Sequence, residues 1–314
     1  MGRLIGMLLF LCCATASAQG YPSKTVRFVS GVTPGAASDT MARMLAEKLS
    51  AILGQPVIVE NRLGAGGLVG ARYVAQQAEP DGHTIMMYAS AFTVSTLLSP
   101  GLDPKELAPV ATVATIPTVM VTPPGKYKTA ADFVSAAKAQ PGKLVCSDAG
   151  IGSATHMAFE RFRFAAGFEA INVHTKGPGE ALTEILSGRA DCYFALIFQA
   201  QKLRDAGKVG ALVVSSPKRS SLMPDLPTTV EAGYANSDYN FWVGALVAAK
   251  TPRDIVERLH KEINALVQSP EISDRIRKLG ADPLTLSIAE FEAMIKRELE
   301  ENAQLIKKAG ITAN

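Results

Sequence analysis

Short apolar runs alternate with amphipathic segments along almost the whole sequence, and this alternation restricts the fold more than any other feature. The runs that we interpret as strands cover residues 24–30, 56–61, 84–90, 109–114, 143–149, 170–175, 191–196, 210–216 and 241–249. Most are continuously apolar, which is typical of strands covered by helices on both faces. The pattern therefore predicts an α/β fold with mostly parallel sheets flanked by helices.

The segments between the strands carry the marks of helix ends. A capping hydroxyl followed three residues later by an acid indicates a helix start, and such pairs begin at Thr129, Thr251 and Ser287. Glycine follows several of the amphipathic runs, as at Gly188 and Gly280, where a left-handed residue can close the last turn.

At 314 residues the chain is longer than a typical single core, which favours two lobes. Proline and glycine interrupt the apolar pattern at 122–129, and a polar stretch interrupts it again at 232–240. If the chain crosses between the lobes at both places, residues 20–121 and 240–314 form lobe 1 and residues 122–239 form lobe 2. Two such hinge crossings permit the lobes to open and close.

The first 18 residues have a composition of their own. Arg3 precedes an apolar run, and Ala16, Ser17 and Ala18 resemble a cleavage site, so residues 1–18 are expected to be a secretory signal peptide. A short membrane anchor is the alternative, but the run is shorter than the roughly 20 residues that span a bilayer. The mature protein is therefore expected in the periplasm.

Charge excludes some partners. The formal net charge is +3, and removal of residues 1–18 takes away only Arg3. A balance this mild predicts neither a nucleic-acid nor a membrane-surface partner.

Cys146 and Cys192 remain after cleavage, both in predicted strands of lobe 2. Export permits a disulfide between them, but buried free thiols are the other possibility.

Small residues fill the loops that follow five of the predicted strands. These loops read "GVTPGAASD", "LGAGGLVG", "ASAFTVS", "DAGIGSATH" and "HTKGPGE", each before a predicted helix and none with an arginine. Ligands of open parallel sheets bind beyond the carboxyl ends of the strands, where helix N-termini offer unpaired N–H groups to anions. Ordinary helix capping would explain any single loop, but five such loops favour an anion site. The candidate ligand-binding residues are Gly35, Ala36, Ala37, Ser38, Asp39, Ser90, Ala91, Gly152, Ser153, Ala154, Thr155, His156, Lys176 and Pro178.

Signatures of catalysis and of cofactors are weak. Gly64, Gly66 and Gly70 miss the dinucleotide-binding spacing by one residue, and Ser153 is not part of a GxSxG motif. The sequence shows no nucleophile beside a base and no Cys and His pair at metal-binding spacing. We therefore expect no catalytic residue, no cofactor and no metal; His156 and His174 adjoin the ligand loops as candidates for side-chain contacts.

Several stretches resemble the Bug family, the extracytoplasmic solute receptors of tripartite tricarboxylate transporters. The resemblance covers essentially the whole mature chain, continues through "GIGSATHMAFERF", and is most specific in "ENRLGAGG" and "MPDLPTTVEAG". It implies a two-lobe periplasmic binding protein, monomeric, that closes on a small organic acid and delivers it to the membrane subunits of such a transporter. It also implies that the loops at 35–39 and 152–156 grip the carboxylate.

This chain departs from the family pattern at three places. Ala36 stands where relatives often have glycine, and His174-Thr175 stands where relatives usually have Pro-Tyr, which predicts altered specificity. After "RAD" the chain continues with Cys192 instead of reaching a second acid, which favours a plain carboxylic acid over an amino acid. A periplasmic sensor that signals to a membrane protein, or an α/β enzyme acting on an organic acid, are the alternatives to a transport receptor.

Overall fold

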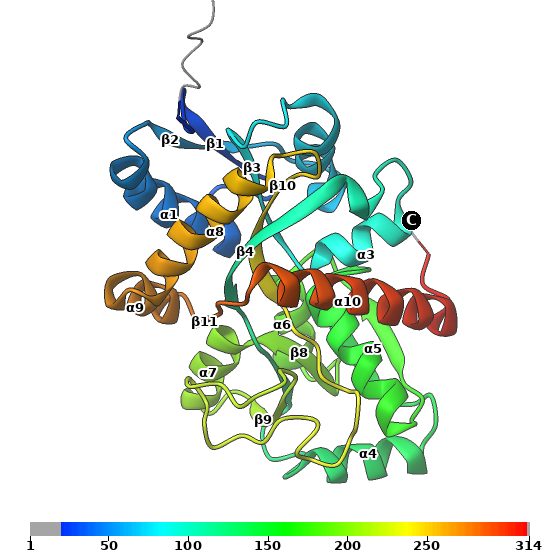
Figure 1. Ribbon diagram of the computed structural model, residues 1–314. Helices are drawn as coiled ribbons and strands as arrows, with labels where there is room; N and C mark the ends of the chain where they lie inside the picture. The colour runs from blue at the N-terminus through cyan, green and yellow to red at the C-terminus, as the bar shows by residue number, and fades with distance from the viewer. Residues whose placement is uncertain (1–19, 313–314) are drawn as a thin grey trace, which may run out of the picture.

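The structure is a computed structural model that describes residues 20–312, and its helices and strands form two lobes, each built around one sheet (Figure 1). The predicted signal peptide at 1–18 lies outside the described residues. The predicted two-lobe α/β architecture is confirmed. Among residues 20–312, no helix has the length and apolar character needed to cross a membrane.

The first sheet has six strands in the order β11-β4-β10-β3-β1-β2. Its strands are β1 (Val26–Ser30), β2 (Val57–Asn61), β3 (Thr84–Ala89), β4 (Leu107–Thr115), β10 (Trp242–Ala248) and β11 (Asp282–Pro283). The helices of this part are α1 (Ala37–Leu53), η1 (Ala65–Gly67), α2 (Leu68–Arg72), η2 (Tyr73–Gln77), α3 (Ala91–Leu98), η3 (Pro104–Glu106), α8 (Arg253–Gln268), α9 (Pro270–Lys278) and α10 (Ile288–Ala309).

The second sheet has five strands in the order β7-β6-β8-β5-β9. Its strands are β5 (Thr118–Thr122), β6 (Val145–Asp148), β7 (Ile171–His174), β8 (Cys192–Leu196) and β9 (Gly210–Val214). The helices are α4 (Ala130–Ala139), α5 (Ala154–Ala166), α6 (Pro178–Leu186) and α7 (Ile197–Asp205).

Most strands of each sheet point the same way. In the first sheet β10 runs antiparallel to both of its neighbours, β3 and β4, so β1 to β4 share one direction. In the second sheet β5 runs antiparallel to β8 and β9, so β6 to β9 share one direction. The mostly parallel character is confirmed. Of the reversed strands, β5 and β10 each follow a crossing between the lobes, whereas the two-residue strand β11, antiparallel to β4, follows α9.

These reversed strands fix how the two sheets face each other. Strand β4 ends at the carboxyl edge of the first sheet, and only Ile116 and Pro117 separate it from β5. Because β5 is antiparallel to its neighbours, it begins at the edge where β6, β7 and β8 end. The carboxyl edges of the two sheets therefore adjoin, and the loops after β1, β2, β3, β6 and β7 lie along those edges.

The position of β5 corrects the predicted lobe boundary. The sequence predicts residues 118–121 in lobe 1, but they pair with β8 and β9 in the second sheet. Pro117 is the one sequence signal that separates β4 from β5, and the apolar pattern continues on either side of it, because the chain leaves one sheet for the other without reversing. The two crossings lie side by side, since Ile116 N donates to Phe241 O at 2.8 Å and Thr115 Oγ1 donates to Asn240 Oδ1 at 2.9 Å.

Apolar side chains cover both faces of each sheet. In the first lobe Phe28 packs with α1 and α8 on one face, while Trp242 and Phe291 pack together on the other. In the second lobe Phe194 lies in the core beneath α4 and α5, and Tyr193, its neighbour in β8, lies on the α6 and α7 face. Such double coverage is the reason that the strand sequences are continuously apolar.

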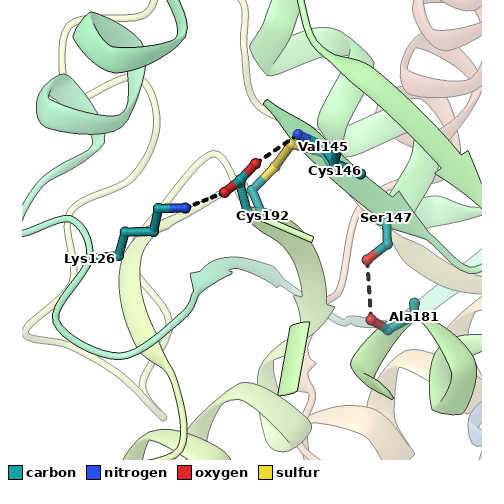
Figure 2. The surroundings of a disulfide bond; sticks show 7 residues. Lys126, Val145, Cys146, Ser147, Ala181 and Cys192 are labelled. Carbon is teal, nitrogen blue, oxygen red and sulfur yellow. Dashed lines mark hydrogen bonds and ion pairs between the residues drawn. A yellow bond between two sulfur atoms is a disulfide. The ribbon is translucent and has the colours of Figure 1, made fainter. Parts of the chain in front are cut away.

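A disulfide joins Cys146 of β6 to Cys192 of β8, with a Cα–Cα distance of 4.5 Å (Figure 2). The two cysteines are register partners on neighbouring parallel strands. Asp191, next to Cys192, accepts the backbone N–H of Val145 at 2.8 Å and pairs with Lys126. The structure thus selects the disulfide over the free thiols that the sequence left open.

Helix α10 lies across the junction of the two lobes, between α3 and α5 (Figure 1). Near its start, Phe291 belongs to the core of the first lobe, whereas Leu305 near its end belongs to the core of the second. Between them, Asn302 donates to Thr93 Oγ1 of α3 at 2.9 Å and accepts from Arg161 of α5 at 3.0 Å. The sequence predicted that residues 240–314 belong to lobe 1. The C-terminal helix instead belongs to both lobes.

Candidate functional site

The loop after β1 is organised by a buried carboxylate. Asp39 is fully buried and accepts the N–H of Gly35 at 2.9 Å, the Nε of Arg43 at 3.0 Å and the Nδ2 of Asn61 at 2.7 Å. Burial acts to raise the pKa of Asp39, but these hydrogen bonds outweigh it and lower the pKa. Asp39 thus stays ionised and shapes the loop, so that its carboxylate is not available as a ligand contact.

The N-terminus of α1 has no side-chain cap. Ala36 occupies the N-cap position, and within the described residues the N–H groups of Ala37, Ser38 and Asp39 have no acceptor. Ala36 has φ −64° and ψ 159°, an extended conformation that alanine adopts without strain. The replacement of glycine by alanine at this position therefore leaves the amide geometry intact, and three donors point from the helix start.

The glycines of the loop after β2 serve close packing. A Cβ atom on Gly31 would lie 2.5 Å from the Cα of Gly67, so the loops after β1 and β2 touch backbone to backbone. The hydroxyl of Tyr88 donates to Gly66 O at 2.7 Å and holds the second loop in place. The "GAGG" sequence therefore supports the first loop, which explains why it resembles a nucleotide fingerprint without matching it.

The loop after β3 contributes less than the sequence suggested. Ser90 is fully buried; its N–H donates to Trp242 O at 3.0 Å and its hydroxyl lies 3.1 Å from that of Tyr239. Ser90 therefore ties α3 to the hinge segment and its side chain is not free for a ligand. The next residue, Ala91, begins α3, and its N–H has no acceptor within residues 20–312.

The loop after β6 is held by its own side chains. Ser153 is the N-cap of α5 and accepts the N–H of His156 at 3.2 Å; His156 Nδ1 in turn accepts the N–H of Gly152 at 3.0 Å. Thr155 accepts the N–H of Ala149 at 2.9 Å. The sequence suggested Gly152 as a ligand-binding residue, but its N–H is already bonded and is not an open donor. The side chains of Thr155 and His156 shape the loop.

Open donors nevertheless remain at this helix start. Within the described residues, the N–H groups of Ile151, Ala154 and Thr155 have no acceptor. Burial lowers the pKa of His156 to about 4, so the ring is neutral near pH 7 and adds no charge. The second lobe thus offers the same feature as the first, namely main-chain donors at the start of a helix.

Lys176 and Pro178 lie in the loop after β7. The N–H of Lys176 donates to Glu180 Oε2 at 3.0 Å, and its side chain is exposed. Pro178 begins α6 and has no N–H, so the first open amides of that helix belong to the two residues after it. Of the two predicted residues, only the Lys176 ammonium can contact an acid.

The two lobes meet beside these loops. A Cβ atom on Gly152 would lie 3.1 Å from Cγ1 of Val94 and 3.4 Å from Cδ1 of Leu98, so the second-lobe loop packs against α3 of the first lobe. Gly66 of the loop after β2 also lies against α3, beside Ser95. Helix α3 therefore brings the loops of the two sheet edges to one place.

Two cavities lie beside α10. One of about 730 Å³ is lined by charged residues of α5 and α10, and it contains none of the predicted residues. Acidic and basic side chains both line it, and Arg161 pairs with Glu301 at 2.8 Å, so the cavity presents no field of one sign. The other, about 260 Å³, is lined by His156 and His174 together with residues 309–312.

Sequence reasoning overlooked the residues that hold the loops from a distance. Arg43 and Asn61 organise the first loop, Tyr239 holds Ser90, and Asp148 pairs with His174. For Asp148 the signal was available, since Asp148 and His174 each lie one residue before the end of a predicted strand, 143–149 and 170–175 respectively.

Facing carboxyl edges, two adjacent crossings and open amides in both lobes define a solute-binding protein of the periplasmic type. Residues 41–311 match the family described as the tripartite tricarboxylate transporter family receptor. The chain belongs to this family, and the resemblance to Bug proteins is confirmed.

Relatives of known sequence and structure extend over nearly the full length. BugT of Bordetella pertussis is 30% identical, over 99% of this chain and 98% of its own. Periplasmic binding protein BugD is 30% identical, with a TM-score of 0.74, over 94% of this chain and 100% of its own. The R. palustris protein Rpa4515, solved with adipate, is 28% identical, with a TM-score of 0.77, over 93% of this chain and 99% of its own. MatC of Rhodopseudomonas palustris, solved with malate, is 26% identical, with a TM-score of 0.73, over 91% of this chain and 100% of its own.

Proposed function

We propose that the signal peptide directs export of this protein to the periplasm and is then cleaved, and that the protein binds a small organic acid between the lobes. It then delivers the acid to the membrane subunits of a tripartite tricarboxylate-type transporter. The observation that carries the proposal is the pair of helix starts, α1 and α5, with open N–H groups on adjoining sheet edges. Because one chain supplies both walls, we expect the receptor to work as a monomer.

Backbone donors are sufficient for the affinity that a receptor needs. A hydrogen bond to a charged group contributes about 1.5–3 kcal/mol, so four of them supply about 6–12 kcal/mol before the entropy of binding is subtracted. Micromolar binding requires about 8 kcal/mol. Arg43, which contacts the first loop through Asp39, is engaged in that ion pair, and this leaves the amides and the helix dipoles to attract the acid.

The contacts of the second loop favour binding over catalysis. His156 Nδ1 accepts from Gly152, so this nitrogen cannot take a proton from Ser153, whose hydroxyl receives the N–H of His156 and lies 3.0 Å from that of Thr155. A receptor releases its ligand unchanged, and mass spectrometry of each acid after incubation tests this. The ligands of two neighbours, adipate and malate, support the choice of substrate class.

The decisive test is a thermal-shift series with adipate, malate and adipamide. Adipamide has the carbon chain of adipate without its charges, so it is the matched control. An acid at 100 times its dissociation constant stabilises the protein by about 2.7 kcal/mol, whereas the diamide should have no effect. Equal stabilisation by the diamide, or stabilisation by a sugar and by no acid, would overturn the site.

Transport and sensing require a separate experiment in cells. Deleting the gene should abolish uptake of the labelled acid while the transcriptional response to that acid persists. Loss of the response with normal uptake would instead establish the sensor.

A further inference from the structure

Three possible metal ligands that are distant in sequence meet at the edge of the second sheet. Asp148 ends β6, and His174 ends β7, where the two residues are register partners. His156 lies in the first turn of α5, the helix that follows β6. One ligand atom from each of the three lies within 4.8 Å of the others. The sequence predicted no metal site because it showed no ligands at close spacing; parallel pairing brings them together.

The three side chains are ordered by contacts with each other. His174 Nδ1 lies 2.7 Å from Asp148 Oδ2, and the two imidazole rings are 4.8 Å apart between centroids, at 73°. Asp148 and His156 are buried, whereas 37% of the His174 side chain is exposed. This arrangement holds the ligands in place before an ion arrives and leaves one of them open to solvent.

A cavity gives an ion access and room for further ligands. Both histidines line the cavity of about 260 Å³, together with Asn172 and Glu160. The amide nitrogen and oxygen of Asn172 are buried and have no partner among the described residues. Water bound to an ion in this cavity would satisfy such groups.

We propose that Asp148, His156 and His174 bind a divalent transition-metal ion. Two imidazoles and one carboxylate suit zinc, nickel or copper, whereas magnesium and calcium prefer sites made entirely of oxygen. Three protein ligands with an open position beside a cavity are typical of zinc sites that keep water or an exogenous ligand. The ion would replace the proton that His174 and Asp148 now share.

Metal binding must also change the bond between Gly152 and His156. The N–H of Gly152 now occupies the lone pair of His156 Nδ1. An ion on Nδ1 displaces this N–H directly; an ion on Nε2 moves the ring proton to Nδ1, where it opposes the N–H of Gly152. In either case the Gly152 amide is released, which provides a spectroscopic signature of the site.

The test is a calorimetric titration of zinc into the untagged, chelator-treated protein without any organic acid, so that its outcome is independent of the proposed function. We expect one equivalent to bind and magnesium not to compete. Asp148→Asn and His174→Asn should each weaken zinc binding at least about 10-fold. His260→Gln is the matched control, because His260 lies on α8 and contacts Val110 O and Asn264.

Amide spectra supply the second measurement. In nitrogen-15 correlation spectra, zinc should shift the Gly152 resonance of the wild type but not that of His174→Asn. His174 is partly exposed, so its replacement should preserve the fold. Absence of zinc binding by the wild type, full affinity in His174→Asn, or loss of binding in His260→Gln would each overturn the proposal.

Discussion

Proline at the first position of α1 or α5 should remove one ligand donor without harming the helix. Ala37 and Ala154 are the first helical residues, a position where proline is well accepted. The residues before them, Ala36 at φ −64°, ψ 159° and Ser153 at φ −65°, ψ 160°, are already extended, as a following proline requires. Ala37→Pro and Ala154→Pro thus delete an N–H and change little else.

The magnitude follows from the hydrogen bond that is lost. One bond to a charged group is worth about 1.5–3 kcal/mol, which corresponds to about 10-fold to about 150-fold weaker binding of the acid. The free energy of unfolding should stay the same or rise by up to about 1 kcal/mol, because proline restricts the unfolded chain. The double variant should lose about the sum of the two free energies if each lobe grips the acid separately.

Arg253→Pro provides the matched control. Arg253 is the first residue of α8 and follows Pro252 at φ −54°, ψ 138°. Since β10 is antiparallel to β3, α8 begins at the opposite edge of the sheet from α1. Isothermal titration with adipate and malate measures affinity, and urea unfolding measures stability. Unchanged affinity in the double variant, or an equal loss in Arg253→Pro, would refute backbone capture.

Three further changes test the framework around the site. Burial raises the pKa of Glu298 to about 8, so the folded protein keeps a proton that the unfolded chain releases; stability should fall as the pH rises from 4.5 to 8. Glu298→Gln should flatten this slope and stabilise the protein at pH 8 by at least about 1.4 kcal/mol, measured by urea unfolding. Replacing Cys146 and Cys192 by alanine opens a closed segment of 46 residues and should lower the unfolding free energy by about 2–4 kcal/mol, measured in denaturant. Gly31→Ala should cost about 1–3 kcal/mol, also measured in denaturant, because the new Cβ meets the Cα of Gly67.

Each of these three has a contrary outcome. A Glu298→Gln variant with the wild-type pH profile would mean that the carboxyl is ionised in the folded protein. A reductant should lower the unfolding free energy of the wild type but not that of the variant lacking both cysteines. An equal loss in both proteins would mean that the disulfide is not what stabilises the wild type. Wild-type stability of Gly31→Ala would mean that the loops after β1 and β2 are less closely packed.

The sequence was sufficient for the local parts of the fold. Capping boxes at Thr129 and Ser287 are confirmed, because a cap depends on residues three positions apart. Thr251 does not cap α8, since the helix begins after Pro252 and the Thr251 hydroxyl has no partner among the described residues. Strand β5 was missed because a crossing between sheets needs no turn, so no glycine or proline cluster separates it from β4.

For the candidate site, the sequence predicted where the loops lie but not what their side chains do. Small residues after parallel strands located the helix starts, because the carboxyl edge of a parallel sheet is a general place for ligands. The roles of side chains depended on contacts across 22 residues for Asp39 with Asn61 and 26 residues for Asp148 with His174. The first pair depends on how α1 packs against β2, and the second on the register of β6 and β7; a single sequence specifies neither.

The two hinge crossings alone would allow the lobes to rotate apart. Helix α10 restricts this rotation, because it packs into the core of the first lobe at Phe291 and into the core of the second at Leu305. A wide opening must therefore detach the last turns of α10 from the second lobe, bend the helix, or detach its first turn from the first lobe. Opening of the lobes and displacement of α10 would then be coupled, and mutations at Leu305 should change how readily the lobes open without altering the ligand contacts.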